Sequence, residues 1–463
     1  MKKRILCTLL SVLMVLTLVV GAAGCAREEA PAPPPVTPTP APPANGDADP
    51  EPPAGNHSQG ITDTEILIGS TYVTSGFMAF IGVPIIDTIE AVFARANAQG
   101  GIAGRNLRLI HYDDGNDPVE GRILMERLLE EDEVFMLTVQ SGVHVTPSLQ
   151  WLRDFGIPIV NITGGIAEMY SEHDPGGTVF NIQPSNEHDG PLLLARAISE
   201  SIFGPNRDEP LPEDVTIGMV YVNTPAGLDV HRGVMGLAAE LGIEDQIIAE
   251  IVTPETYATV IQQFMDAGVG VVLGGILDSA GFVAAMDDAG WMAPWIGSYG
   301  TSTIASYNAE TYNPLRPIYA NAWAEFLSPE AEAMLEDFNN ALTYHPTLDD
   351  DTRESYADNA FAVVGYFAAY VIVEALRRIE AAGIDFTWDN FVWAMESAPW
   401  HVAGTGGFDF ANGRRMGVSD LALFYYTAEP DGAGGFDEFQ GLIRPFESVD
   451  EILAKRGWVR NPS

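Results

Sequence analysis

From residue 61 onward, short apolar runs alternate with longer amphipathic stretches. The apolar runs predict buried strands, and the stretches between them repeat apolar residues at helical spacing. Strands that alternate with helices in this way indicate βαβ units with parallel sheets. We expect strands at residues 66–72, 107–112, 134–139, 157–162, 215–222, 247–252, 269–273 and 295–298. We expect helices at residues 84–98, 118–131, 147–155, 187–203, 227–241, 256–267 and 280–289.

The alternation occurs in two series, divided by a break around residues 184–212. Each series repeats the strand–helix–strand unit, so the expected fold class is α/β with two doubly wound parallel-sheet lobes. After residue 301 the pattern turns helical, and the clearest helices are expected at residues 330–342 and 356–382. A final strand is expected at residues 422–427.

The first 24 residues have the pattern of a signal peptide. A basic start, Lys2-Lys3-Arg4, precedes an apolar run at residues 5–20 that is shorter than the ~20 residues needed to cross a bilayer. Small residues at 21–24 stand directly before Cys25. This arrangement resembles the lipobox of bacterial lipoproteins, which implies that lipid is attached to Cys25 after cleavage. Ordinary signal cleavage beside an incidental cysteine is the alternative.

Residues 25–60 form the expected tether between Cys25 and the folded region. They are rich in proline and poor in apolar residues, so they cannot offset their ordering entropy by burial. An extended chain of this composition would span a distance on the order of 100 Å. The sequence contains Cys7 and Cys25 and no other cysteine, so the mature chain cannot form an internal disulfide or a zinc site made of cysteines.

The charge and the motifs exclude several classes of function. The 64 acidic residues outnumber the 23 basic ones, and a net charge of −41 argues against a nucleic-acid partner. The sequence has no G-x-S-x-G elbow, no H-E-x-x-H motif and no P-loop, so we expect neither an enzyme nor a bound cofactor. The acidic runs at 113–117 and 349–351 do not fit a calcium-binding loop, so no metal site is expected.

Several short segments occur in a characteristic order along the folded region. They are Ile61-Thr62-Asp63-Thr64-Glu65-Ile66, Gly100-Gly101-Ile102-Ala103-Gly104-Arg105, Asp113-Asp114-Gly115-Asn116-Asp117-Pro118, Gly156-Ile157-Pro158 and Phe408-Asp409-Phe410-Ala411-Asn412-Gly413-Arg414. Together they resemble the leucine/isoleucine/valine-type (branched-chain amino acid) solute-binding proteins of ABC transporters. The resemblance covers nearly all of residues 61–460. It implies the type I periplasmic binding fold, with two lobes joined by crossover strands.

The resemblance also implies how the chain is divided between the lobes. Residues 61–184 and about 318–405 would form lobe one, and residues 185–317 and about 406–463 would form lobe two. A small-molecule ligand would then lie in the cleft between them.

Loops at the carboxyl ends of the lobe-one strands are the first candidates for the ligand site, because ligands of open parallel sheets bind there. These loops contain Tyr72, Ser75, Ser141 and Thr163. Hydroxyl groups and backbone N–H groups in such loops suit a carboxylate or amide oxygen. The resemblance implies that Gly142, Thr163, Gly164 and Gly165 hold the ligand carboxylate. The alternative is that these residues serve the turns alone.

In lobe two the sequence departs from the amino-acid binders of this family. Tyr299 stands where they place an acidic residue on the ligand's ammonium group, and Ile276 stands where an aromatic residue closes over the ligand. A phenol is a weak partner for a buried ammonium, so a small carboxylate, an amide or an aromatic acid becomes competitive with an α-amino acid. Asp278 is a candidate substitute anion. The alternative for Tyr299 is a core ring whose hydroxyl is satisfied within the protein.

We therefore expect the extracytoplasmic solute-binding subunit of an ABC importer, anchored to the membrane by lipidated Cys25. Its partners would be a small-molecule ligand and an ABC permease. The alternative is a ligand sensor of the same fold that feeds a signalling receptor.

The anchor leads to a first prediction. The Cys25→Ala variant should be released from the membrane fraction as a soluble protein, because it has no thiol to carry lipid. Fractionation followed by a carbonate wash measures this, and a variant that stays membrane-bound after the wash would show that the lipoprotein interpretation is wrong.

Overall fold

The computed structural model describes residues 58–140, 142, 145–170, 174–200, 212, 214–276, 278–299, 318–357, 359–418, 420–430 and 436–460. The predicted signal peptide, Cys25, nearly all of the tether and the site candidate Ser141 lie outside the described residues.

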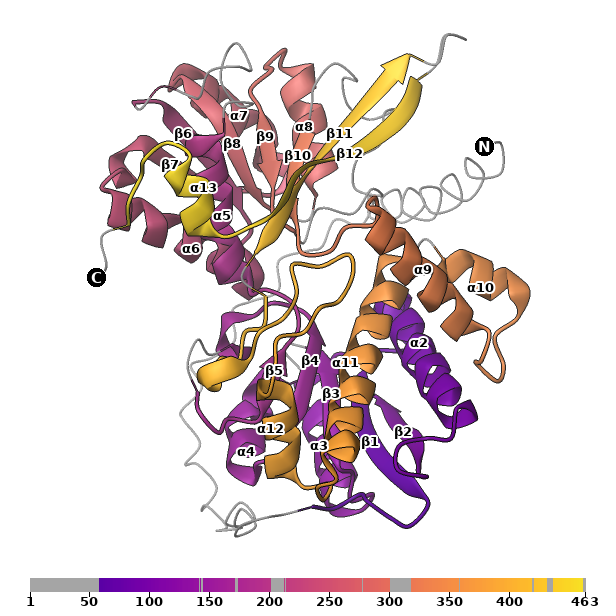
Figure 1. Ribbon diagram of the computed structural model, residues 1–463. Helices are drawn as coiled ribbons and strands as arrows, with labels where there is room; N and C mark the ends of the chain where they lie inside the picture. Colours follow the sequence, from indigo (N-terminus) through magenta and orange to yellow (C-terminus); the bar gives the residue numbers. More distant parts are fainter. Residues whose placement is uncertain are drawn as a thin grey trace, which may run out of the picture. The chain divides into compact units, whose positions relative to one another are not determined.

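The described strands form two sheets, as the alternating pattern predicts (Figure 1). The first has the order β2-β1-β3-β4-β5, and all its neighbouring strands are parallel. Its strands are β1 (Glu65–Tyr72), β2 (Asn106–Asp113), β3 (Met136–Gln140), β4 (Ile159–Thr163) and β5 (Val179–Asn181). The second sheet has the order β12-β11-β10-β9-β8-β6-β7. Its strands are β6 (Thr216–Tyr221), β7 (Ile247–Ile251), β8 (Val269–Gly275), β9 (Trp295–Gly297), β10 (Ile318–Ala322), β11 (Leu421–Pro430) and β12 (Phe436–Glu447).

Helices pack against both sheets (Figure 1). With the first sheet, in lobe one, are α2 (Ala79–Ala98), α3 (Pro118–Glu130), α4 (Leu149–Phe155), α9 (Pro329–Leu342), α10 (Asp350–Tyr356), α11 (Ala360–Ala382) and α12 (Trp388–Glu396). With the second sheet, in lobe two, are α5 (Asn186–Ser199), α6 (Pro225–Leu241), α7 (Tyr257–Asp266), α8 (Ser279–Asp288) and α13 (Val449–Ala454). The expected α/β fold with parallel sheets in two lobes is confirmed.

Helix α11 is the central helix of lobe one and lies beside α2, although the two are far apart in sequence (Figure 1). It is long and apolar enough to cross a membrane, yet most of its apolar window is buried inside the protein, as in a core helix. The approach to α2 is close at Gly365, where a Cβ atom would lie 2.6 Å from the carbonyl oxygen of Ile85. Glycine is therefore required there by packing.

The single helix expected at residues 356–382 is wrong in its first turn. The structure has two helices, α10 and α11, separated at Asn359. Asn359 has extended backbone, and its side chain accepts hydrogen bonds from the N–H groups of Phe361 and Ala362. An asparagine that caps the N-terminus in this way starts a new helix instead of continuing the previous one.

Three strands were missed, and one of them, β10, displaces an expected lobe boundary. Strand β5 has three residues, too few to show a pattern; β10 and β12 belong to the second sheet. Residues 318–322 therefore lie in lobe two and not in lobe one. Conversely, residues after 406 still contact lobe one, since Asp174 N–H donates to the carbonyl of Gly413 and Met416 bridges to Asn181. The chain crosses between the lobes later than the sequence indicates.

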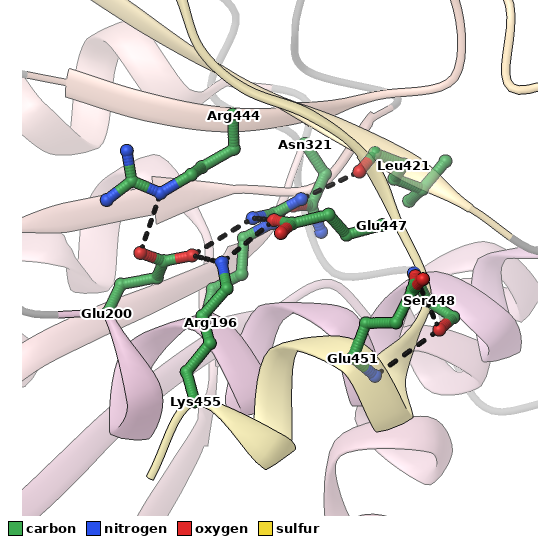
Figure 2. Close-up of polar contacts among 9 residues, drawn as sticks. All are labelled: Arg196, Glu200, Asn321, Leu421, Arg444, Glu447, Ser448, Glu451 and Lys455. Atoms are coloured by element: carbon green, nitrogen blue, oxygen red, sulfur yellow. Dashed lines mark hydrogen bonds and ion pairs between the residues drawn. The ribbon is translucent and has the colours of Figure 1, made fainter.

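A buried charge network joins α5 to the last two strands and to α13 (Figure 2). The guanidinium of Arg196 is fully buried and faces the carboxylates of Glu200 at 3.5 Å and Glu447 at 3.3 Å. It also donates to the carbonyl of Leu421 at 2.7 Å. The ammonium of Lys455 lies 2.5 Å from Glu200 and 2.9 Å from Glu447. Each buried charge thus has a partner of opposite sign, as burial of ions requires.

This network predicts a large loss of stability when its central cation is removed. Arg196→Met keeps much of the side-chain volume but leaves buried Glu200 and partly buried Glu447 with fewer partners, which costs about 3–5 kcal/mol. Equilibrium urea unfolding measures the change. The matched control is Arg127→Met, because Arg127 is half exposed and pairs with exposed Glu131. A loss from Arg196→Met no larger than from the control would contradict this account.

Candidate functional site

The carboxyl ends of β1, β3 and β4 lie side by side, because these strands are neighbours in the first sheet. Tyr72 is the last residue of β1 and Thr163 the last of β4, and both side chains are buried. Neither hydroxyl meets the geometry of a hydrogen bond to a described residue, although the two lie close enough for Thr163 to act on Tyr72 as a hydrogen-bond partner. Burial raises the pKa of Tyr72 well above its ordinary value, and the nearby Thr163 hydroxyl opposes that rise. Buried hydroxyls that the protein satisfies so incompletely call for an explanation, and contact with an oxygen of a solute is one candidate.

The other lobe-one candidates are used mainly in turns. The carbonyl of Gly142 accepts hydrogen bonds from the N–H groups of Val145 and Thr146 and from the Thr146 hydroxyl at 2.8 Å. Ser75 is exposed and starts the short helix η1 (Gly76–Met78) without capping it. A hydrogen bond from the Ser75 hydroxyl helps to lower the pKa of Asp113 against the opposing effect of burial. A ligand role for Gly142 and Ser75 stays a prediction.

The loop that follows β4 contacts both lobes. Gly164 has a left-handed backbone with φ of 88°, and its carbonyl accepts a hydrogen bond from the Gln183 side chain. The carbonyl of Gly165 accepts from the N–H of Asn186, the first residue of α5, at 2.8 Å. Ala167, which starts η3 (Ala167–Met169), donates its N–H to Asp229 on α6 at 2.9 Å. We refer to residues 164–167 as the β4 loop.

Tyr299 from lobe two lies against the β4 loop. A Cβ atom at Gly165 would overlap the Tyr299 hydroxyl, so only glycine leaves room for the ring. The hydroxyl donates to the carbonyl of Pro184 at 2.9 Å, and the Tyr299 N–H donates to Asp189 at 2.9 Å. Burial raises the pKa of Tyr299 well above its ordinary value. The hydroxyl is thus satisfied within the protein, as expected for a packed ring, and contact with a ligand stays a prediction.

The remaining lobe-two candidates lie at the start of α8. Ile276 is buried in the core of this lobe, and its carbonyl accepts from the Ser279 hydroxyl at 3.1 Å. Asp278 is exposed and caps α8, because its carboxylate accepts from the N–H of Gly281 at 3.1 Å. The same carboxylate accepts from the hydroxyl of Tyr257 on α7 at 3.0 Å. The structure brings Asp278 to α7, and no contact joins it to Tyr299 or the β4 loop among the described residues.

Two acidic residues near Tyr299 were missed by sequence reasoning. Asp229 on α6 is 3% exposed and lies between the N–H of Ala167 and the guanidinium of Arg232, which is 2.9 Å away. Burial raises its pKa, and those two partners oppose the rise. Asp189 on α5 is fully buried and accepts from the side chain of Asn321 at 2.7 Å. The sequence signal for both is an acid beside the apolar stripe of an amphipathic helix.

The protonation of Asp189 predicts a dependence of stability on pH. Burial raises its pKa to about 7, although the Asn321 amide and the Tyr299 N–H favour the ionised form. Because the ordinary pKa of an aspartate is about 3.9, the folded protein holds this proton more strongly than the unfolded chain does. The stabilisation is therefore fully present below about pH 4 and is lost as the pH rises to about 7.

We expect the free energy of unfolding of the wild type, relative to that of Asp189→Asn, to fall by roughly 1 kcal/mol or more between pH 4.5 and 7 and then to level off. Denaturant unfolding at several pH values measures the slope. The readout is how the difference in free energy of unfolding between the wild type and Asp189→Asn changes with pH. Other acids titrate in both proteins and cancel in this difference, so the remaining change comes from Asp189. A difference that stays constant with pH would show that Asp189 does not titrate in this range.

Comparisons with known proteins identify the family of the chain. A model of the family described as periplasmic binding protein matches residues 65–433. The Leu/Ile/Val-binding protein homolog 2 of Brucella abortus is 23% identical over 380 residues, which cover 81% of this chain and 93% of that protein.

Solved structures share the fold at low identity. A fatty acid ABC transporter substrate-binding protein from Thermomonospora curvata has a TM-score of 0.62 and 16% identity, covering 88% of this chain and 97% of that one. A solute-binding protein from Rhodopseudomonas palustris HaA2, in complex with p-hydroxybenzoic acid, has a TM-score of 0.60 and 15% identity, covering 82% and 98%. An ABC transporter substrate-binding protein from Desulfitobacterium hafniense, in complex with Leu, has a TM-score of 0.57 and 16% identity, covering 81% and 100%. The family match over most of the chain, together with the two-lobed parallel-sheet fold, shows that the chain belongs to the periplasmic binding protein family.

Proposed function

We propose that this chain is the extracytoplasmic solute-binding subunit of an ABC importer, and that it captures a small carboxylate, amide or aromatic acid between its lobes. Membership of the periplasmic binding protein family supports binding without catalysis. The observation that carries the proposal is the pair of buried hydroxyls, Tyr72 and Thr163, at the carboxyl edge of the first sheet. That edge is where open parallel sheets bind their ligands.

In this mechanism the solute joins the lobes. Its oxygen atoms would accept hydrogen bonds from the lobe-one hydroxyls, and its remaining surface would contact lobe two. A ligand shifts a hinge equilibrium only by its difference in affinity for the two states, so contact with both lobes is what closes the cleft. The closed form would then be presented to the permease. Structural neighbours that are named as transporter substrate-binding proteins favour import over the sensor alternative.

The ligand class follows from the charges near the β4 loop. The hydroxyl of Tyr299 is donated to the Pro184 carbonyl, so this residue offers no negative charge to an ammonium group. Asp229 is nearby, but its carboxylate already has Arg232 and the Ala167 N–H as partners. Burying an ammonium group without an anion to pair with it costs several kcal/mol. A solute without an ammonium group avoids this cost.

The neighbours show that the fold accepts both kinds of solute. One was solved with leucine and another with p-hydroxybenzoic acid. The fold of this chain is about equally similar to both, with TM-scores of 0.57 and 0.60. The choice between them therefore rests on the side chains of this chain. The lipid anchor at Cys25 belongs to the same proposal, since it would keep the binding domain close to its permease.

The ligand class can be tested by titration calorimetry with leucine, its 2-keto analogue and its amide analogue without the α-amino group. We expect leucine to bind at least about tenfold more weakly than the better of the two analogues, because each 1.4 kcal/mol of unpaired charge costs a factor of ten. Tight leucine binding that is abolished by Asp278→Asn would contradict this proposal and would make Asp278 the missing acid.

A companion variant tests the site itself. Tyr72→Phe should weaken the preferred analogue by about five- to tenfold, since it removes one hydrogen bond of about 1 kcal/mol to the solute. The control is Tyr366→Phe, because the Tyr366 hydroxyl is bonded to Asp337 at 2.6 Å, on another part of lobe one. Equal effects of the two variants would remove Tyr72 from the site.

A further inference from the structure

The β4 loop belongs to lobe one by sequence but is held largely by lobe two. It follows directly after Thr163, so its conformation fixes where the candidate ligand groups lie. Its contacts come from the crossover segment through Gln183, from α5 through Asn186, from α6 through Asp229 and from Tyr299. A loop with this set of contacts changes its surroundings whenever the lobes move apart.

The contact from Asp229 differs from the others in its chemistry. It is a hydrogen bond from a backbone N–H to a carboxylate, and it joins η3 of lobe one to α6 of lobe two at 2.9 Å. Bonds of this kind, with an ionised acceptor, are roughly twice as strong as bonds between neutral groups. The N–H is the first of a short helix, where no partner within the helix exists and an external acceptor is favoured.

The surroundings of Asp229 keep its carboxylate in place. Arg232, one turn further along α6, donates to the second carboxylate oxygen at 2.9 Å. Glu187 on α5 lies 3.0 Å from the same guanidinium and holds it in turn. Asp229 is 3% exposed although Arg232 beside it is largely exposed.

We propose that Asp229 is an interlobe latch that holds the β4 loop in its ligand-binding conformation and biases the lobes toward closure before any solute arrives. This inference rests on the proposed hinged binding mechanism, and Asp229 acts in it as a positioning residue. Opening the lobes would break the bond to Ala167 and release the loop that carries Gly164 and Gly165. The latch thus couples the shape of the binding loop to the closure of the cleft.

The latch can be broken from either side. Asp229→Ala removes the acceptor. Ala167→Pro removes the donor without changing any charge, and proline is well tolerated at the first position of a helix. The preceding residue, Ile166, has φ of −67° and ψ of 124°, which is the conformation favoured before proline. Asp229→Asn is the conservative variant, because its amide oxygen can still accept from Ala167.

The experiment measures the opening of the lobes in the absence of solute. Spin labels are placed at Glu120→Cys on α3 and Glu255→Cys beside α7, in the mature chain with Cys25→Ala. Both positions are exposed. Glu120 follows β2 and Glu255 follows β7, and each of these strands is the edge of its sheet that is farthest from the crossovers between the lobes. Pulsed electron paramagnetic resonance then gives the distance distribution between the lobes. Asp245→Ala, at an exposed acid of lobe two, is the control for charge.

We expect Asp229→Ala and Ala167→Pro each to shift the distribution toward longer distances, and the double variant to shift it no further. Asp229→Asn, whose neutral amide oxygen accepts a weaker bond, should shift the distribution less than Asp229→Ala, and Asp245→Ala should resemble the wild type. Hydrogen exchange supplies a local readout, since the Ala167 N–H should exchange about tenfold faster or more in Asp229→Ala and by a smaller factor in Asp229→Asn.

A wild-type distribution in Asp229→Ala and Ala167→Pro overturns the latch. A shift in Asp229→Ala alone also overturns it, because the bond would not be the cause. If one variant fails to fold, as judged by circular dichroism, the other decides. The latch and the binding function can be disproved separately. The label distances are measured without solute and test the latch, whereas the binding function is disproved only if calorimetry detects no binding of any solute.

Discussion

The rest of lobe two depends on the neutralisation of two opposite charges buried on α5. Asp189 and Arg196 are seven residues apart, so they lie on the same face of the helix, and both are fully buried. Asn321 of β10 joins them, since its amide donates to Asp189 at 2.7 Å and its oxygen accepts from Arg196 at 3.1 Å. Any shift of β10 along α5 would break the hydrogen bonds that Asn321 makes to both buried groups. This requirement fixes the strand that precedes the second crossover.

The same pair of charges places the candidate site. Asp189 accepts the N–H of Tyr299, which directs that ring toward Pro184 and Gly165. Arg196 binds the carbonyl of Leu421, where the chain enters lobe two for the second time. A polar network in the core is costly unless every member is satisfied, but once satisfied it specifies one arrangement. Here that arrangement holds the crossover segments and the β4 loop together.

The scarcity of cations makes this use of them notable. The chain has 23 basic residues against 64 acidic ones, yet two of its arginines are among the largest fully buried side chains. The second is Arg415, which donates to Gly177, pairs with Glu396 at 2.6 Å and lies over the ring of Phe180. Both arginines lie close to places where the chain passes between the lobes. Cations are thus placed at the crossovers, while the acids remain mainly at the surface, where water and salt screen them.

The sequence by itself determined the α/β class, the two series of strands and most helices, because strand and helix periodicity are local properties of the chain. It also pointed to the edge where Tyr72 and Thr163 meet, since the carboxyl ends of parallel strands share one side of a sheet. It could not place β5, which is too short, or β10, which is defined by pairing with the distant β11; the twelve-residue β12, which pairs with the neighbouring β11, was also missed. Nor could it show that Asn359 divides a helix.

Only the tertiary structure decided which acids belong to the site. Asp278 stood close in sequence to a candidate loop, but its carboxylate is committed to α8 and Tyr257. Asp229 lies beside the β4 loop because a residue 62 positions away in the chain supplies the backbone N–H that its carboxylate accepts. Burial and hydrogen bonding between distant segments set the role of a charged side chain, and these are properties of the folded chain that periodicity does not record.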